Sequence, residues 1–182
     1  MDITKEPGLF EQAGSVLHEL ERFTSCIVLA VGAGGEEEQV EFAENLRFRE
    51  RLIAWVERGG RLVVQGERGG WPEWFDKTWE YDDYRRTTHE CRAKTRGDVH
   101  WCKWYPEAQG SITSSINVKA MMMTGVPMEE ILFGLPKSSE LVEFGWTAVA
   151  LGKFGEGLVS SFGDVNATGD TCAIMAVIAR GP

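Results

Sequence analysis

Apolar residues recur along the chain at two different spacings, which predict alternating helices and strands. Three segments carry them at helical spacing and are predicted helices: residues 8–22, 37–58 and 168–179. Five short, mainly apolar runs are predicted strands: residues 26–31, 61–65, 116–123, 146–151 and 158–162. Gly59 and Gly60 are expected to end the second helix, because glycine tolerates the left-handed conformation of a helix cap.

The order of these elements predicts an α/β fold. A helix with short connections joins the first two strands, which is typical of a right-handed parallel crossover. The last two strands flank the glycine-rich residues 152–157, which favours an antiparallel hairpin. We therefore expect a three-layer αβα sandwich with a flavodoxin-like, mostly parallel sheet and a C-terminal antiparallel hairpin. No repeat or linker interrupts the chain, so residues 1–182 are expected to form one domain.

Residues 71–110 differ in composition from the rest of the chain. They hold five of the seven Trp and all three Tyr, and their apolar residues follow no regular spacing. We predict loops with short edge strands here, forming an aromatic-rich insertion or edge segment. Aromatic faces beside Arg side chains suit stacking on a sugar or another planar ligand. The alternative, which most Trp clusters follow, is a small second core over the sheet edge.

Charge and composition restrict the classes of function. The formal net charge is −9 and the acidic residues are concentrated in residues 1–50, which disfavours nucleic-acid and anionic-membrane binding. No apolar run reaches the length of a membrane span, and the N-terminus lacks the pattern of a secretory signal. The four cysteines are most simply reduced thiols, with Cys26 and Cys172 in the core, so we expect a cytoplasmic protein.

Two motifs are more specific. Residues 59–67 read GGRLVVQGE, and residues 154–166 contain FGEGLV followed by GDVN. They resemble the "GG-x-L-V-x-x-G" strand and the terminal "G-x-G-x-V…G-D-x-N" hairpin of the class I glutamine amidotransferase-like superfamily. The best resemblance is to its trehalose-utilisation (ThuA-like) branch and related fungal proteins, whose "Y-x-R-T-T" run is similar to residues 84–88. The resemblance covers most of residues 8–180.

The resemblance also indicates what this chain lacks. Catalytic members of the superfamily carry a Cys nucleophile on a tight strand-to-helix turn, activated by a later His and carboxylate. Here the equivalent turn, residues 66–70, carries Glu67 and no Cys, and no His follows the last strand. Glutamine hydrolysis by that triad is therefore not expected. The family usually opens with a strand that residues 1–7 do not supply, so we hypothesise a sheet edge completed by a homodimer.

Candidate ligand contacts gather at one predicted edge of the sheet. Glycine-rich turns follow the first two strands, and open α/β sheets bind ligands at the carboxyl ends of parallel strands. Glu67 is the candidate catalytic acid or base. The expected ligand contacts are Gly34, Gly66, Arg68, Trp71, Arg85, His89, Asp164 and Asn166. Helix capping is the alternative role for Asp164 and Asn166, and a surface ion pair is the alternative for Glu67 and Arg68.

A paired His-x-Cys pattern is the candidate metal site. His89, Cys91, His100 and Cys102 could close a tetrahedral zinc site, although their spacing is not that of the common zinc motifs. The simpler alternative is that these side chains pack in an aromatic-rich loop, and a Cys91–Cys102 disulfide is disfavoured in a reducing compartment. No other cofactor is expected.

Three functions are compatible with these patterns. The first is the binding or processing of a small polar metabolite, such as a carbohydrate, at the carboxyl ends of the strands. The second is a non-catalytic oligomerisation or protein-interaction module, in which packed side chains fill that edge. The third is a zinc-dependent hydrolase that uses the His/Cys cluster.

Overall fold

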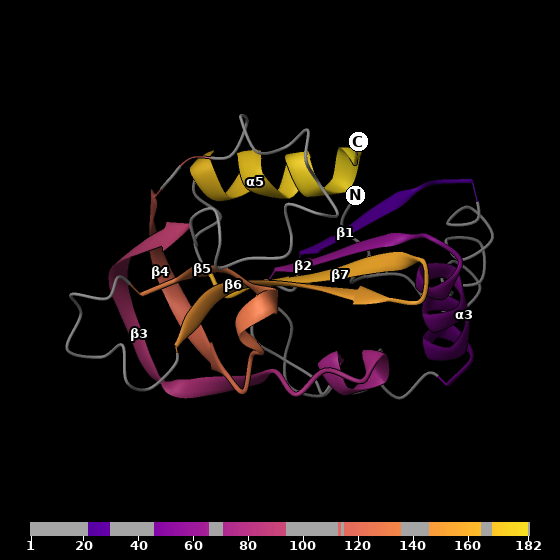
Figure 1. The fold of residues 1–182 in the computed structure, drawn as a ribbon, viewed down its shortest axis with the longest axis horizontal. Coiled ribbons are helices and arrows are strands. Elements are labelled where there is room, and N and C mark those ends of the chain that lie inside the picture. The colour runs from indigo at the N-terminus through magenta and orange to yellow at the C-terminus, as the bar shows by residue number, and fades with distance from the viewer. Residues whose placement is uncertain are drawn as a thin grey trace, which may run out of the picture.

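The computed structural model describes residues 22–29, 46–65, 71–93, 113, 115–135, 146–164 and 169–181. In this part of the chain, seven strands form one sheet with helices packed against it (Figure 1). The strands are β1 (Ser25–Leu29), β2 (Arg61–Gln65), β3 (Glu80–Ala93), β4 (Ser115–Thr124), β5 (Ile131–Gly134), β6 (Thr147–Phe154) and β7 (Gly157–Phe162). The α-helices are α3 (Leu46–Glu57) and α5 (Gly169–Arg180), and the short 3-10 helices are η1 (Pro72–Phe75) and η3 (Met128–Glu130). No helix within these residues is long and apolar enough to cross a membrane.

The sheet has the strand order β1-β2-β7-β6-β4-β3-β5. The pairs β1–β2 and β2–β7 are parallel, and the other five pairings are antiparallel. The α/β class is confirmed, but the prediction of a mostly parallel sheet is wrong for the described strands. Consecutive parallel strands need a long crossover between them, usually a helix. The described residues that connect β3, β4, β5, β6 and β7 to one another contain no α-helix.

The antiparallel half of the sheet curls back on itself. β5 pairs with β3 and also with β6, so β6, β4, β3 and β5 close a ring of neighbouring strands. The parallel half, by contrast, stays open and ends at β1 in the described sheet. The fold therefore joins an open, parallel half to a curled, antiparallel half along β7 and β6, whose hairpin the sequence predicts correctly.

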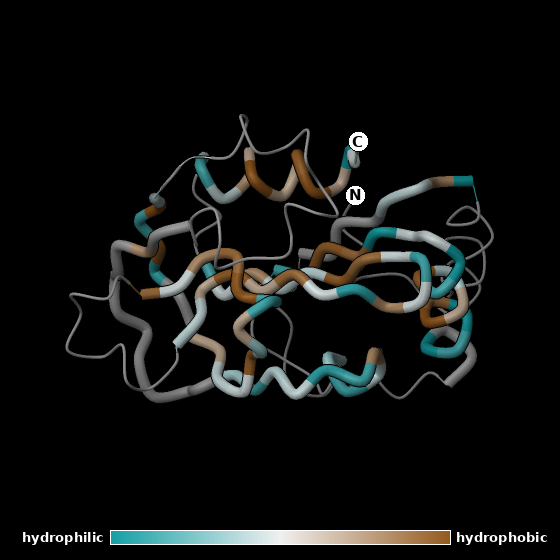
Figure 2. The backbone as a smooth tube through the Cα atoms, viewed as in Figure 1, coloured by the Kyte–Doolittle hydropathy of each residue, from teal (hydrophilic) through white to brown (hydrophobic). Residues whose placement is uncertain are grey.

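Apolar clusters cover both faces of the sheet, and β2 contributes to both. Val63 belongs to the cluster beneath α5, together with Ile174 and Ile178 of that helix. Leu62 and Val64 face the other way, into the cluster that contains Leu52, Trp55 and Val56 of α3. This alternation is the period of two expected for a strand buried on both faces. Figure 2 shows the apolar stretches of the chain gathered in the central strands and along α5.

Glycine ends helix α3 as predicted. Gly59 has a φ of +110°, and its N–H donates to the Val56 oxygen over 2.9 Å. A Cβ atom on Gly60 would lie 2.5 Å from the Trp55 ring, so only glycine lets the chain pass this close to the helix. The predicted helical residues 37–45 lie outside the described residues, as do residues 8–21 of the first predicted helix.

Three further expectations need correction. β3 is 14 residues long and lies between β4 and β5, so loops with short edge strands are wrong for residues 80–93. Half of the residues of β3 are charged, so its sequence lacks the apolar pattern of a strand. It is a strand because its backbone pairs with β4, and that pairing does not depend on apolar side chains. β6 continues to Phe154, so the hairpin turn is two residues long and the predicted glycine-rich join of residues 152–157 is shorter than expected. Cys172 is exposed on α5 instead of packed in the core.

Candidate functional site

The parallel strands end level with one another. Leu29 of β1 pairs with Gln65 of β2, and Gln65 pairs with Phe162 of β7. The chain therefore leaves all three strands at the same edge, as the sequence predicts. Several predicted site residues follow these strand ends but lie outside the described residues: Gly34, Gly66, Glu67, Arg68 and Asn166.

Gln65, the last residue of β2, is a buried polar side chain at this edge. It is 1% exposed, and its Nε2 atom donates to the backbone oxygen of Asp164 over 2.7 Å. A backbone oxygen can only accept, so the amide nitrogen must face it and the amide oxygen must point elsewhere. That oxygen, Oε1, is buried and has no hydrogen-bond partner. Gln65 was not among the predicted contacts, although a polar residue ending an apolar strand is a visible signal.

Asp164 connects this edge to helix α5. Its side chain is fully buried, and its Oδ2 atom accepts a hydrogen bond from Oγ1 of Thr171 over 2.7 Å. Thr171 lies in the first turn of α5, where a negative charge interacts favourably with the helix dipole. The bond comes from a side-chain hydroxyl and not from a backbone N–H, so helix capping and a direct ligand contact both stay predictions for Asp164.

Trp71 is packed inside the cluster beneath α3. It is 6% exposed, and its ring makes edge-to-face contacts with Phe75 and Trp79 at centroid distances of 6.2 Å each. The ring is therefore part of a small second core, as the packing alternative predicts, and its face is not open for stacking. The indole nitrogen, Nε1, is buried and has no hydrogen-bond partner.

Two buried polar atoms in the described part of the chain have no hydrogen-bond partner. They are Gln65 Oε1 and Trp71 Nε1. In the sequence these two residues stand immediately before and after residues 66–70, which lie outside the described residues. Buried polar groups are nearly always paired in native proteins, so the unpaired acceptor and the unpaired donor require an explanation.

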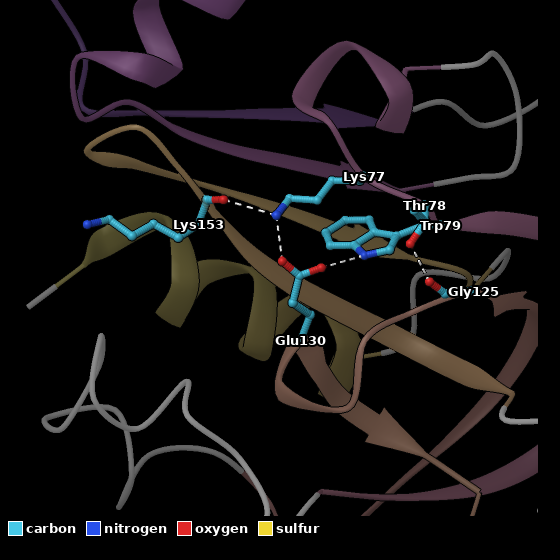
Figure 3. A network of polar contacts seen from close by, with 6 residues as sticks. All are labelled: Lys77, Thr78, Trp79, Gly125, Glu130 and Lys153. Atoms are coloured by element: carbon cyan, nitrogen blue, oxygen red, sulfur yellow. Dashed lines mark hydrogen bonds and ion pairs between the residues drawn. The ribbon is translucent and has the colours of Figure 1, made fainter.

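A nearly buried ion pair connects the residues just before β3 to η3 and β6 (Figure 3). Nζ of Lys77 lies 2.5 Å from Oε1 of Glu130 and 3.0 Å from the Lys153 oxygen, and the two charged side chains are 9% and 12% exposed. Oε2 of Glu130 accepts from Trp79 Nε1 over 2.8 Å, so both carboxylate oxygens are engaged. Trp79 also contacts Trp71 edge to face, so the network lies at the border of the same aromatic cluster.

Gly152 makes room for that network. A Cβ atom at this position would lie 2.7 Å from both Glu130 Oε1 and Lys77 Nζ. The ion pair thus lies directly over the backbone of β6, where any side chain would displace it. The sequence shows Gly152 as part of a glycine-rich join, but its role depends on this close approach.

A hydroxyl pair lies on the same face as Trp71. The Tyr81 hydroxyl is 2.5 Å from Oγ of Ser161, which is buried on β7 next to Val64 of β2. Tyr81 packs against the apolar cluster that contains Trp71. Neither residue was singled out from the sequence, because strand pairing brings them together across 80 positions.

The other predicted site residues on β3 lie in the antiparallel half. His89 pairs with Val118 of β4, and Arg85 falls between Asp82 and Thr87, where the register with β4 shifts. Cys91 is fully buried in the cluster beneath α5, which fits the packing alternative for its thiol. The described residues contain no group of three potential metal ligands, and His100 and Cys102 lie outside them.

Comparison with known proteins gives a likeness of fold alone. No family model and no curated protein matches the chain. Among solved structures, the β-galactosidase of Bacillus circulans sp. alkalophilus is similar, with a TM-score of 0.51 and 15% identity over 89% of this chain and 23% of that one. The β-galactosidase of Rahnella sp. R3 has a TM-score of 0.47 and 16% identity, over 89% of this chain and 23% of that one. An exo-β-1,4-mannosidase from Opitutaceae bacterium strain TAV5 has a TM-score of 0.41 and 16% identity, over 82% of this chain and 22% of that one. The chain thus spans less than a quarter of each of these structures.

Proposed function

We propose that this chain binds a small polar metabolite at the carboxyl ends of β1, β2 and β7. The observation that carries the proposal is the unpaired acceptor of Gln65 and the unpaired donor of Trp71 on either side of residues 66–70. Leaving a buried polar atom unpaired costs roughly 1–3 kcal/mol. A ligand that pairs with both atoms would recover this free energy on binding, which makes the edge a favourable binding site.

Glu67 is the proposed acid or base if the bound metabolite is also processed. In the sequence it lies between Gln65 and Trp71, two positions after Gln65. A carboxyl group can transfer protons to a ligand only when it lies within hydrogen-bond distance of it. Unchanged ligand turnover in a Glu67→Gln variant would remove Glu67 from this role.

We also propose that the domain is a glutamine amidotransferase-like αβα sandwich of the ThuA-like type. Three features support this assignment: the parallel β1–β2–β7 order, the β6–β7 hairpin and the apolar clusters on both faces of the sheet. The curled antiparallel half formed by β3, β4 and β5 would then be an elaboration of that sandwich.

The two Trp residues of the aromatic cluster allow a matched test of ligand binding. Trp71→Phe removes an N–H that has no partner, whereas Trp79→Phe removes an N–H that donates to Glu130. We would screen a library of polar metabolites against the wild-type chain by ligand-observed NMR and then measure the affinity of each hit for both variants.

The proposal predicts that one variant changes ligand affinity and that the other changes only stability. Trp71→Phe should weaken the hits about tenfold, since it removes a hydrogen bond worth roughly 1.4 kcal/mol to the ligand. Trp79→Phe should lower the free energy of unfolding but leave the affinity unchanged. Equal affinity of every hit for the wild type and for Trp71→Phe would reject the proposal.

A second candidate function is a non-catalytic interaction module. The observation in its favour is that β1 ends the strand order of the described sheet, which suits pairing with a second copy of the chain. Light scattering coupled to size-exclusion chromatography tests it, because a strict monomer at all concentrations rejects a homodimer.

A further inference from the structure

Helix α5 is apolar on the side that faces away from the sheet as well as on the side that packs against it. Its inner side contributes Ile174, Met175 and Ile178 to the cluster beneath the helix. Its outer face consists of exposed or partly exposed residues without charge: Cys172, Ala173, Ala176 and Val177. A helix at a protein surface normally carries polar residues on its outer side, and an apolar outer face indicates a contact surface.

The two charged residues of α5 flank this outer face, one at each end of the helix. Asp170 lies in the first turn and Arg180 in the last turn, and both are exposed. With a rise of 1.5 Å per residue, the two residues are roughly 15 Å apart along the helix axis. A second α5 laid antiparallel on the first would therefore place Asp170 beside Arg180 at both ends, whereas a parallel one would place like charges together.

We infer that the outer face of α5 binds a second copy of this chain. The two α5 helices lie antiparallel about a two-fold axis near Met175, so the same face is used by both copies. The apolar residues meet in the middle, and an Asp170–Arg180 ion pair closes each end. This surface differs from the free side of β1, and the inference does not depend on the proposed ligand site.

Charge reversal separates a contact between two copies from an effect within one helix. An acid in the first turn and a base in the last turn also interact favourably with the dipole of their own helix. In the dimer, Asp170→Arg places two bases together at each end, and Arg180→Asp places two acids together there. In a heterodimer of the two variants, opposite charges meet again at both ends.

Sedimentation velocity over a range of concentrations gives the dissociation constant of the wild type, of each variant and of their equimolar mixture. We expect a wild-type dimer, at least about tenfold weaker association of each variant alone, and recovery of most of that loss in the mixture. A role in the helix dipole alone would give no recovery on mixing, which would overturn the inference. A wild-type chain that stays monomeric at every concentration would also overturn it.

A cysteine at position 176 provides a second test that leaves both charges in place. Position 176 is one residue from the midpoint at Met175, so its Cα atoms in the two copies are about 5 Å apart when the helix axes pack about 8 Å apart. That separation suits a disulfide. Cys172 is three residues from the midpoint, so its counterpart lies about 9 Å away along the axis, too far for a disulfide.

The test compares oxidation of the double variant Ala176→Cys, Cys172→Ser with that of the wild type and of Cys172→Ser. The double variant should form a disulfide-linked dimer at least about tenfold faster on non-reducing gels, although Cys172 is the more exposed position. Equal rates would indicate random collision and would reject the α5 contact. Circular dichroism melts establish that each variant is folded, and the cross-link decides alone if a charge variant is not.

A dimer formed through another surface gives a different set of results. If the wild type dimerises but neither charge reversal nor the thiol at position 176 has an effect, the α5 contact is rejected. Pairing at the free side of β1 then becomes the favoured contact, and the proposed ligand site is unaffected.

Discussion

Gln65 and Asp164 are 99 positions apart, yet the side-chain nitrogen of Gln65 lies 2.7 Å from the Asp164 backbone oxygen. This bond ties the end of β2 to the end of β7, and the Asp164–Thr171 bond continues it to helix α5. Both bonds are buried, where the low dielectric strengthens them. The carboxyl edge of the parallel strands is therefore held by specific polar contacts, and Gln65 Oε1 is left as an acceptor beside them.

Thr171→Val is expected to destabilise the fold because it removes a hydrogen-bond donor from a fully buried carboxylate. Valine has nearly the same shape as threonine, so the loss should reflect the Asp164 contact. We expect a loss of about 1–3 kcal/mol in the free energy of unfolding, measured by urea denaturation. Thr171→Ser keeps the hydroxyl and should lose less. Equal losses in the two variants would contradict a role for the hydrogen bond.

The Lys77–Glu130 ion pair is expected to be strongly coupled, because both side chains are nearly buried. Lys77→Met leaves the Glu130 carboxylate without its cationic partner, and we expect it to cost roughly 1–3 kcal/mol. The double variant with Glu130→Met should be more stable than the sum of the two single losses predicts. A double-mutant cycle from urea denaturation measures this coupling, and additive losses would show that the pair contributes little.

Gly125 and Gly59 provide a matched pair of glycines with positive φ. A Cβ atom on Gly125 would lie 2.2 Å from the backbone oxygen of Thr78, whose hydroxyl donates to the Gly125 oxygen (Figure 3). A Cβ atom on Gly59 would meet nothing within 4 Å. Both alanine variants carry backbone strain of about 1–2 kcal/mol, but Gly125→Ala adds a clash with backbone. Thermal unfolding should therefore show a clearly lower Tm for Gly125→Ala.

Cys91 and Cys172 are expected to differ in their reactivity toward alkylating reagents. Cys172 is exposed on α5, whereas Cys91 is fully buried beneath the same helix. Iodoacetamide should therefore alkylate Cys172 in the native protein and Cys91 only after unfolding. Peptide mass spectrometry measures both sites in one experiment, with a urea-unfolded sample as the control. Alkylation of native Cys91 at the rate of Cys172 would contradict the packing around β3.

Some helix and strand ends could be predicted because residues close to them in the sequence determine where they lie. β2 ends at Gln65 as predicted, because the apolar residues 62–64 are followed by Gln65 and then by glycine-rich residues. The end of α3 follows from Gly59, and the β6–β7 hairpin follows from the short distance between two apolar runs. β3 was missed because half of its residues are charged, and its conformation depends on pairing with β4.

The common edge of the parallel strands was predictable, but the buried polar atoms found near it were not. Parallel pairing of β1 and β2 follows from a strand, helix and strand in sequence, so the edge at Gln65 could be foreseen. Trp71 was predicted as a ligand contact in an aromatic segment suited to stacking, whereas its ring is packed and its N–H is the unpaired group. Whether a polar side chain is buried and unpaired depends on neighbours far along the chain, which spacing alone does not reveal.

By itself, the sequence determined the α/β class, the common edge of the parallel strands and the absence of Cys from residues 66–70 after β2. Tertiary structure alone decided which polar atoms lie unpaired at that edge, that Lys77 and Glu130 meet over Gly152, and that the second half of the sheet is antiparallel. The physical reason is the separation along the sequence over which each interaction acts. Apolar spacing and glycine act over a few residues, whereas hydrogen-bond partners and strand neighbours are chosen between segments that meet only when the whole domain packs.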